Sequence, residues 1–356
     1  MRRLLRHKLL LLLPALALVG CGCRPEGPAG RSGRVPQPLP YRVTHVLCYH
    51  HLTDTPKSAY DVKPADFRAQ LQALRDGGYQ SINCRQVAGY LGNTQDLPER
   101  SVVISFDDGR ASVLRIAKPL LDEFGFQAVL FINPDAVGGN NYLSWDDLKT
   151  LAQAGYEIGS HTMSHLNLTR KLKKLSREAF QQKVREEIEA SYREIETRLG
   201  QAPVALAYPF GNYDAAVMQM TRDAGYRLGL SIDPGAVDNQ SDPLALPRKM
   251  IVDGTSLRTF QRNLDTQPLH LTDRQPPLGT RATSRTYTLT AHLGDAEAAS
   301  SLIAEGGRGA KAKYDTATGQ LTVTTRLNRG ANLVRVFSTG TPRRETAWIV
   351  VCDVTD

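Results

Sequence analysis

Two adjacent carboxylates and a pair of histidines are the residues of this chain that could do chemistry together. Asp107 and Asp108 follow the apolar run Val102–Phe106, which is typical of a buried strand. Successive strand residues point to opposite faces, so one carboxylate can bind a metal while its neighbour stays free as a base. About fifty residues later, the spacing of His161 and His165 predicts two imidazoles on one side of a helical turn. Two imidazoles and one carboxylate, with a position left open, form the ligand set of a hydrolytic zinc site.

Each of these two motifs also has a purely structural interpretation. Asp and Gly form turns, so Asp107-Asp108-Gly109 alone is typical of a solvated turn. A His-x-x-x-His pair alone seldom indicates a metal site. Both motifs, however, follow short apolar runs, and α/β folds gather their catalytic loops at the ends of such strands. The combination therefore favours a metal-dependent hydrolytic site.

The elements that must position these residues follow an alternating pattern from about residue 41 to residue 265. The predicted strands cover residues 45–49, 102–106, 128–132, 156–159, 204–208, 227–232 and 248–252. The predicted helices cover residues 64–76, 112–124, 144–154, 176–199, 214–224 and 256–265. Strand followed by helix, repeated, predicts an α/β domain at residues 41–266, with a parallel sheet or barrel and helices outside it.

The pattern changes in the last part of the chain. Helical periodicity fades, and β-branched runs separated by Gly-rich turns take its place. The candidate strands there cover residues 285–293, 320–327, 332–338 and 347–354. They predict a small all-β sandwich at residues 280–356, joined to the α/β domain by a proline-bearing linker at residues 267–279.

The N-terminus carries a targeting signal. A basic segment precedes an apolar run at residues 9–19, which is shorter than the ~20 apolar residues that span a bilayer. The run ends in Leu18-Val19-Gly20-Cys21, which resembles the lipobox of bacterial lipoproteins. This implies a signal peptide at residues 1–20 and a lipid on Cys21; an ordinary secretory signal is the alternative. Residues 21–40, rich in Gly, Pro and Arg, are then a flexible tether, and the non-acidic Gly22 favours the periplasmic face of the outer membrane.

Charge and cysteine content exclude other classes of function. The formal net charge is +8, and the basic residues of the signal region account for half of it, so the chain does not indicate nucleic-acid binding. Membrane contact is expected through the lipid anchor only. The five cysteines lack metal-ligand spacing and do not suggest a disulfide framework, although export permits a bridge such as Cys48 with Cys84.

Three motifs in a fixed order resemble the polysaccharide deacetylases of carbohydrate esterase family four. Ser105 to Gly109, His161 to His165 and Tyr208-Pro209-Phe210-Gly211 follow one another, each in a strand–helix context. The resemblance covers roughly residues 41–265. It implies a distorted (β/α) barrel of about seven strands, a divalent metal that is usually zinc, and hydrolysis of an N- or O-acetyl group on a sugar.

The resemblance also implies roles for individual residues. The implied metal ligands are Asp108, His161 and His165. Asp107 resembles the general base, which would take a proton from a water made acidic by the metal. The backbone N–H of Phe210 or Gly211 would hold the oxyanion that develops on the acetyl carbonyl; a plain turn is the alternative for this motif.

The sequence departs from the commonest family pattern in two places. Many members carry an Arg ahead of the Pro in the third motif, where it pairs with the base, but Ala207 and Tyr208 stand there in this chain. Arg248 opens a later apolar run and is the candidate replacement, with a surface Arg at a strand start as the alternative. The late Leu-x-His motif that normally supplies a general acid is matched only by Leu269 and His270, in the predicted linker.

A histidine at the end of the first strand is the better acid candidate. Tyr49-His50 resembles the branch of the family that deacetylates exported poly-N-acetylglucosamine in biofilms, a branch that also carries Tyr-Pro-Phe-Gly. An imidazole has the intrinsic pKa to protonate a leaving amine near neutral pH. A buried histidine at the strand end is the alternative for His50.

The expected function is metal-dependent removal of acetyl groups from N-acetylglucosamine units of a cell-envelope or exported polysaccharide, with poly-N-acetylglucosamine favoured. Peptidoglycan, chitin oligomers and O-acetyl esters are alternative substrates. A catalytically silent polysaccharide-binding lipoprotein is the alternative of another class. The intact set of two carboxylates and two histidines argues against that alternative. The sequence identifies no export-machinery partner.

Overall fold

The computed structural model describes residues 38–294, 298 and 301–354. The predicted signal peptide, the lipid-attachment residue Cys21 and residues 21–37 of the predicted tether lie outside this part of the chain. No helix within it is long and apolar enough to cross a membrane.

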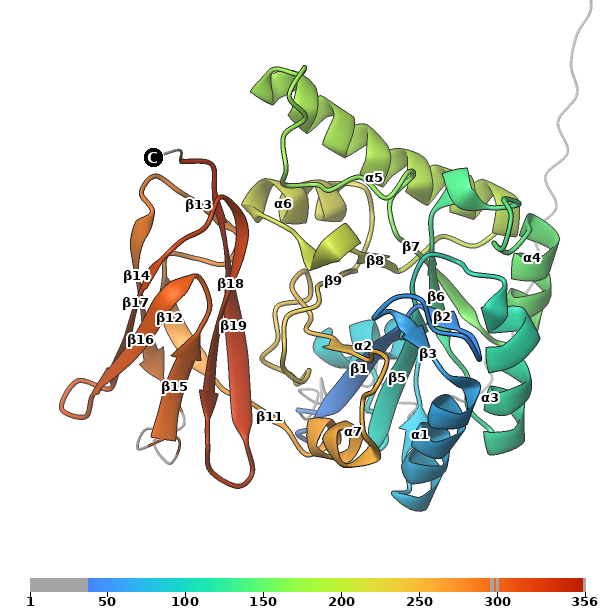
Figure 1. Cartoon of the computed structure of the whole chain (residues 1–356), viewed down its shortest axis with the longest axis horizontal. Helices are drawn as coiled ribbons and strands as arrows, with labels where there is room; N and C mark the ends of the chain where they lie inside the picture. Colours follow the sequence, from blue (N-terminus) through green and yellow to red (C-terminus); the bar gives the residue numbers. More distant parts are fainter. Residues whose placement is uncertain (1–37, 295–297, 299–300, 355–356) are drawn as a thin grey trace, which may run out of the picture. The chain divides into compact units, whose positions relative to one another are not determined.

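Seven parallel strands form a curled half-barrel (Figure 1). In spatial order they are β10 (Lys249–Met250), β1 (Thr44–Tyr49), β5 (Ser101–Phe106), β6 (Val129–Ile132), β7 (Glu157–Ser160), β8 (Ala205–Ala207) and β9 (Leu228–Leu230). A short strand, β4 (Gln80–Ser81), pairs with β5 on the side of the path. All seven correspond to runs identified from their apolar residues, so the predicted distorted barrel is confirmed.

Helices connect and cover these strands. They are α1 (Pro64–Asp76), α2 (Cys84–Leu91), α3 (Lys118–Phe124), α4 (Trp145–Gln153), α5 (Arg177–Leu199), α6 (Ala215–Asp223) and α7 (Leu257–Leu264). The helix predicted at residues 112–124 begins with a π-helical stretch, Val113–Ala117, in which the N–H of Lys118 donates to the Val113 carbonyl. Helix α2 was not predicted; Asn83 caps it by accepting from the N–H of Gln86.

Both faces of the parallel sheet are buried, because alternate strand residues point in opposite directions. Val103 and Phe131 belong to a core that includes residues of α2. Their neighbours Ile104 and Leu130 belong to a second core, with residues of α1, α3, α4 and α7. Helices α5 and α6 pack on a third, which includes Leu206 of β8. This burial fixes the strands, so the loops that leave them have defined starting points.

A β-rich region with antiparallel sheets follows the half-barrel (Figure 1). One sheet has the order β12 (Leu271–Gln275), β14 (Thr286–Leu293), β17 (Gln320–Arg326) and β16 (Arg308–Asp315). The other has the order β11 (Gln267–Pro268), β19 (Arg344–Cys352), β18 (Gly330–Ser338) and β15 (Leu302–Glu305), with β13 (Thr280–Ala282) also on β19. Trp348, fully buried, lies in the core of this region.

The segment predicted as a linker is part of these sheets. Strand β11 pairs with β19, and β12 pairs with β14. Pro268 lies on the edge strand β11, where a missing N–H costs no ladder hydrogen bond, so proline there did not signal a loop. Residues 267–279 therefore differ from the expected free connection.

Residues 39–356 form one compact unit, and ion pairs join the half-barrel to the β region. Arg281 of β13 lies 2.7 Å from Asp214, the residue that caps α6. Lys249 of β10 is paired with Glu345 of β19, and both side chains are buried. A further pair of strands, β2 (His51–Leu52) and β3 (Asp61–Val62), follows β1 in the chain.

Candidate active site

The loops after β5 and β7 bring the predicted metal ligands together. Asp108 follows β5, and His161 and His165 follow β7. Oδ1 of Asp108 lies 3.9 Å from Nε2 of His161 and 3.7 Å from Nε2 of His165. The two imidazole rings are 4.8 Å apart, centre to centre. Parallel strands end at the same edge of a sheet, which explains why segments about fifty residues apart meet here.

The histidine loop is not helical, so the predicted helical turn is wrong. Thr162 and His165 have φ values of 65° and 63°, in the left-handed region that residues other than glycine rarely adopt. Asp108 has a φ of 71°. Such conformations cost free energy and persist where the surrounding structure holds them. A spacing of four residues suits a helix, but here two left-handed residues bring the imidazoles together instead.

Helix α5 supplies the residues that hold this loop. Glu187 accepts hydrogen bonds from the N–H of Ser164 at 2.8 Å and from its hydroxyl at 2.6 Å. The carbonyl of Glu187 accepts from the N–H of Met163 at 3.1 Å. Ser160, at the end of β7, shares a hydrogen bond of 2.7 Å with Ser191 of the same helix. These contacts compensate the strained backbone around the histidines.

His161 is held in the tautomer that a metal ligand needs. Its Nδ1 lies 2.7 Å from the carbonyl oxygen of Ala207, to which it donates, so the lone pair of Nε2 faces Asp108 and His165. Burial lowers the pKa of His161 to about 4, although the Asp107 carboxylate opposes the shift. The imidazole is therefore neutral. A neutral imidazole with a fixed tautomer, next to a second imidazole and a carboxylate, fits a divalent metal.

The structure places Arg248 of the segment before β10 against Asp107. Nη1 of Arg248 donates to Oδ1 at 2.7 Å, and Nη2 donates to Oδ2 at 2.9 Å. Nε of Arg248 donates to the Ser231 carbonyl at 2.8 Å, which fixes the guanidinium. Both side chains are almost fully buried. Because one guanidinium occupies both oxygens of Asp107, Asp108 is the carboxylate left for a metal.

The charge state of Asp107 follows from these neighbours. Burial alone would raise the pKa of Asp107, but the Arg248 guanidinium, with smaller effects from His161 and His50, holds it well below the usual range for a carboxyl group. Asp107 is thus ionised at every physiological pH. Arg248 contributes orientation and charge balance rather than high basicity.

His50, at the end of β1, also reaches this carboxylate. A ring nitrogen of His50, the Cys48 sulfur and an Asp107 oxygen lie within 4.8 Å of one another. Burial raises the pKa of the Cys48 thiol, which donates to Asp107 at 3.4 Å. Nδ1 of His50 has no hydrogen-bond partner within the described part of the chain. The neighbouring His51 instead pairs with Asp61 at 3.1 Å.

In the third motif, only one of the two amides predicted to bind the oxyanion remains available. The N–H of Gly211 donates to the Tyr208 carbonyl at 2.8 Å, so Gly211 does not offer its amide to a substrate. The amide of Phe210 is the remaining candidate, and this residue has a left-handed φ of 60°. The Phe210 ring is 55 % exposed and lies 4.7 Å from the ring of His165, centre to centre. Gly211 is required for space, because a Cβ would approach Ile232 to 2.2 Å.

The structure does not bring His270 to this site. Its Nε2 lies 2.6 Å from Oδ2 of Asp238. The cavity that His270 lines shares no described residue with the hollow at Asp108. The cysteines Cys48 and Cys84 are free thiols, so no bridge joins them.

Sequence reasoning assigned no site role to two residues of the hollow at Asp108. This hollow, of about 430 Å³, is also lined by Arg110, Asn133 and Tyr142. Asn133 donates to the His161 carbonyl at 2.8 Å, and it follows β6 as Asp107 follows β5, which was the available signal. The guanidinium of Arg110 lies 4.5 Å from the centre of the Tyr142 ring, and no pattern in the sequence pointed to Arg110.

The sequence matches known deacetylases. Residues 94–229 match the family model for polysaccharide deacetylases. The Bacillus subtilis protein YxkH, which carries a polysaccharide deacetylase name, is 27% identical over 215 residues, covering 60% of this chain and 74% of that protein. Poly-beta-1,6-N-acetyl-D-glucosamine N-deacetylase of Escherichia coli is 24% identical over 267 residues, but this chain spans only 40% of its length. The protein of the same name from Staphylococcus aureus is 25% identical over 200 residues, covering 54% of this chain and 69% of that protein.

Solved structures share the fold. Streptococcus pyogenes deacetylase PplD, solved with acetate, has a TM-score of 0.58 and 22% identity, and the match covers 63% of this chain and 99% of that one. IcaB from Ammonifex degensii has a TM-score of 0.54 and 24% identity, covering 64% of this chain and 98% of that one. Residues 94–229 thus match a polysaccharide deacetylase domain, and the half-barrel shares the fold of solved deacetylases.

Proposed function

We propose that this protein removes acetyl groups from N-acetylglucosamine units of a cell-envelope or exported polysaccharide in a metal-dependent reaction. The observation that carries the proposal is the buried Arg248–Asp107 pair, placed directly beside Asp108, His161 and His165. Poly-N-acetylglucosamine is the favoured polymer, because the Escherichia coli and Staphylococcus aureus relatives are named for acting on it.

Asp108, His161 and His165 are the residues that would hold the metal. Two imidazoles and one carboxylate suit zinc, which is the ion we propose. A divalent metal there would polarise the acetyl carbonyl and lower the pKa of water towards ~7. The loop contacts from Glu187 and the bond from His161 to Ala207 fix the ligands before any metal arrives.

Asp107 would act as the general base. It accepts the proton of the attacking water, and the bidentate bond from Arg248 holds the carboxylate in one orientation. Its low pKa keeps it ionised and ready to accept. A positioned carboxylate of this kind contributes to rate through proximity and orientation.

Phe210 and His50 would serve the acetyl oxygen and the leaving amine. The Phe210 amide, whose backbone is left-handed, would donate to the oxyanion that develops on the carbonyl. His50 lies next to the base, and its imidazole would donate the proton to the leaving amine. His50 replaces His270, which is paired elsewhere.

We also propose a cell-envelope location. The basic and apolar N-terminal segment and Cys21 are consistent with a lipid anchor, and the absence of an acidic residue after Cys21 favours the outer membrane, facing the periplasm. An anchored deacetylase would meet a polymer as it passes through the envelope.

Acetate release from defined substrates tests the proposal. The whole chain, with metal removed or zinc restored, is incubated with poly-β-1,6-N-acetylglucosamine, chitin hexamer, peptidoglycan and acetylated xylan, while metal content is measured separately. We expect zinc-dependent release from the first substrate and its loss in Asp107→Asn, with zinc still bound. Acetate release from only one of the other substrates would make that compound the proposed substrate in place of poly-N-acetylglucosamine. If the protein binds no divalent metal in stoichiometric amount, the proposed mechanism is overturned and a catalytically silent binding protein is favoured.

A further inference from the structure

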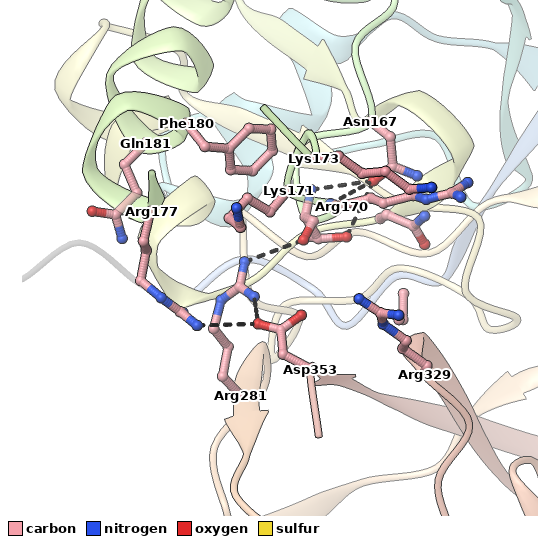
Figure 2. Close-up of a pocket in the computed structure, with 14 residues that line it drawn as sticks. Asn167, Arg170, Lys171, Lys173, Arg177, Phe180, Gln181, Arg281, Arg329 and Asp353 are labelled. Carbon is pink, nitrogen blue, oxygen red and sulfur yellow. Dashed lines mark hydrogen bonds and ion pairs between the residues drawn. The ribbon is translucent and has the colours of Figure 1, made fainter. Parts of the chain in front are cut away.

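A second cavity, of about 870 Å³, is lined mainly by cations (Figure 2). Residues of the loop after β7 and of α5 form one side, and residues of the β region form the other. The charged residues of the first side are Arg170, Lys171, Lys173 and Arg177. The β region adds Arg281, Arg329 and a single carboxylate, Asp353. Among the described residues, six cations thus face one anion.

Two of these cations are already balanced. Nη1 of Arg281 lies 2.6 Å from Oδ2 of Asp353, and Nη2 lies 2.7 Å from Asp214. Nη2 of Arg177 lies 3.5 Å from the same oxygen of Asp353. Figure 2 shows these three labelled side chains converging, with dashed lines between them. These paired side chains shape the wall of the cavity, and their charges are already neutralised by carboxylates.

The other cations lack such partners. Within the described part of the chain, no carboxylate lies at ion-pairing distance from Arg170, Lys173 or Arg329. Lys171 donates to the Leu175 carbonyl, and no described carboxylate lies at ion-pairing distance from it. In Figure 2, Arg329 reaches into the hollow from the β region, and Arg170 and Lys173 line it from the loop. Like charges around one hollow raise its positive potential, and a bound anion would lower that potential.

The side chains define the chemistry of this anion. A guanidinium presents a planar pair of donors that matches a carboxylate or a phosphate. The amides of Asn167, Gln181 and Asn212 lie in the same lining, where they can bind hydroxyl groups. The volume is that of a pocket for an oligosaccharide-sized ligand. A hollow of this kind suits a discrete acidic sugar better than a flat lipid surface.

The cavity shares its loops with the candidate active site. Asn167 follows His165 by two residues in the histidine loop, and Asn212 directly follows Phe210 and Gly211. A chain bound by these two loops at the reaction centre has further residues of the same loops available to bind its continuation.

We propose that this cationic cavity binds a carboxylate- or phosphate-bearing segment of the polysaccharide on which the enzyme acts. The inference rests on the proposed function in taking the ligand to be a polysaccharide. It adds that the natural polymer, or a polymer attached to it, carries acidic groups. Poly-N-acetylglucosamine, which is neutral, would then be deacetylated without filling the cationic cavity, which would bind the acidic groups.

Binding without turnover tests the inference on the whole chain in the Asp107→Asn background. Fluorescence anisotropy follows labelled hyaluronan hexasaccharide for the carboxylate, pentamannosyl phosphate for the phosphate, and neutral chitin hexamer. The test variant is Lys173→Gln with Arg329→Gln. The matched control, Lys311→Gln with Lys313→Gln, removes two exposed charges from β16, outside the cavity.

We expect the test variant to weaken binding of at least one anionic probe about tenfold or more, and the control to change it less than twofold. Neutral hexamer should bind equally to both. Equal loss in test and control, or no loss in either, would overturn the proposal. Binding of phosphatidylglycerol vesicles that depends on these cations, without binding of either sugar, would assign the cavity to a membrane instead. If the double variant unfolds early, Arg170→Gln is judged by the same criterion. Because this test measures binding and not acetate release, its result can be interpreted even if the proposed deacetylation fails.

Discussion

The candidate reaction centre and the cationic cavity treat charge in opposite ways. At the reaction centre, the Arg248 guanidinium and the Asp107 carboxylate are both buried and bonded through two hydrogen bonds. In the cavity, Arg170, Lys173 and Arg329 are exposed and have no carboxylate at ion-pairing distance among the described residues. A buried charge must be compensated within the protein, whereas an exposed one can wait for a ligand.

This difference indicates what each place is built to do. Internal compensation fixes the proposed base, Asp107, before substrate arrives, so little reorganisation would accompany the proposed reaction. Uncompensated cations around an open hollow hold no neighbouring side chain in place, but they favour the binding of an anion from solution. The difference also ranks the consequences of substitution, because breaking a buried pair costs far more than removing a solvated charge.

The largest effect is expected from Arg248→Met. This change leaves the Asp107 carboxylate buried without its partner, which costs about 3–5 kcal/mol of unfolding free energy. Arg329→Met, in the cationic cavity, should change it by no more than about 0.5 kcal/mol. Urea unfolding of both variants at pH 7 measures the contrast. Similar losses in the two would remove the distinction between the sites.

A buried carboxylate without a bidentate guanidinium sharpens the comparison. Asp233 accepts from the Tyr213 hydroxyl at 3.0 Å, and burial raises its pKa to about 6, opposite in direction to Asp107. A raised pKa means that the folded state binds the proton more tightly. The stability it contributes is therefore full below about pH 4 and is lost as pH rises through about 6.

The substitution Asp233→Asn should remove this dependence. Relative to the unmodified protein, the variant should gain about 2–3 kcal/mol in unfolding free energy between pH 4 and pH 7.5. The difference between the two proteins is the quantity to compare. Buried His45, whose pKa burial lowers to about 4, gives both proteins an opposite trend over the same range. A difference that stays constant with pH would show that Asp233 titrates normally.

Arg248→Lys tests orientation separately from charge. A lysine keeps the positive charge but cannot form two parallel hydrogen bonds to Asp107. We expect kcat for acetate release to fall about 10- to 100-fold, with little change in KM and an unchanged metal content. Lys173→Arg, which alters a cation of the cavity, should leave kcat within about twofold on a neutral substrate. Full activity in Arg248→Lys would mean that charge alone suffices.

Salt gives the smallest expected effect at the reaction centre. The stability difference between the unmodified protein and Arg248→Met should vary by less than about 0.5 kcal/mol between 50 and 500 mM NaCl, because a buried pair is little screened. Anion binding by the cavity should weaken over the same range. A salt-dependent stability difference would indicate that water and ions reach Asp107.

Local patterns in the sequence predicted much of the fold. The seven strands of the half-barrel are short apolar runs, and Ser144, Ser176, Asp214 and Ser256 cap helices where the periodic patterns begin. Strand β16 escaped prediction because its exposed residues Lys311 and Lys313 alternate with small alanines, which leaves no apolar signal. Helix α2 was missed because eight residues carry little periodicity.

The sequence by itself determined the candidate reacting groups: short motifs contain Asp107, Asp108, His161 and His165, and the chemistry of these residue types is local. Only the tertiary structure decided how they work. Arg248 is 141 residues from Asp107, and the two meet because β10 pairs with β1, which pairs with β5. The left-handed histidine loop, held by α5, and the gathering of cations from the loop after β7 and the β region were equally decided there. Each depends on contacts between segments far apart in the chain, which local residue preferences do not encode.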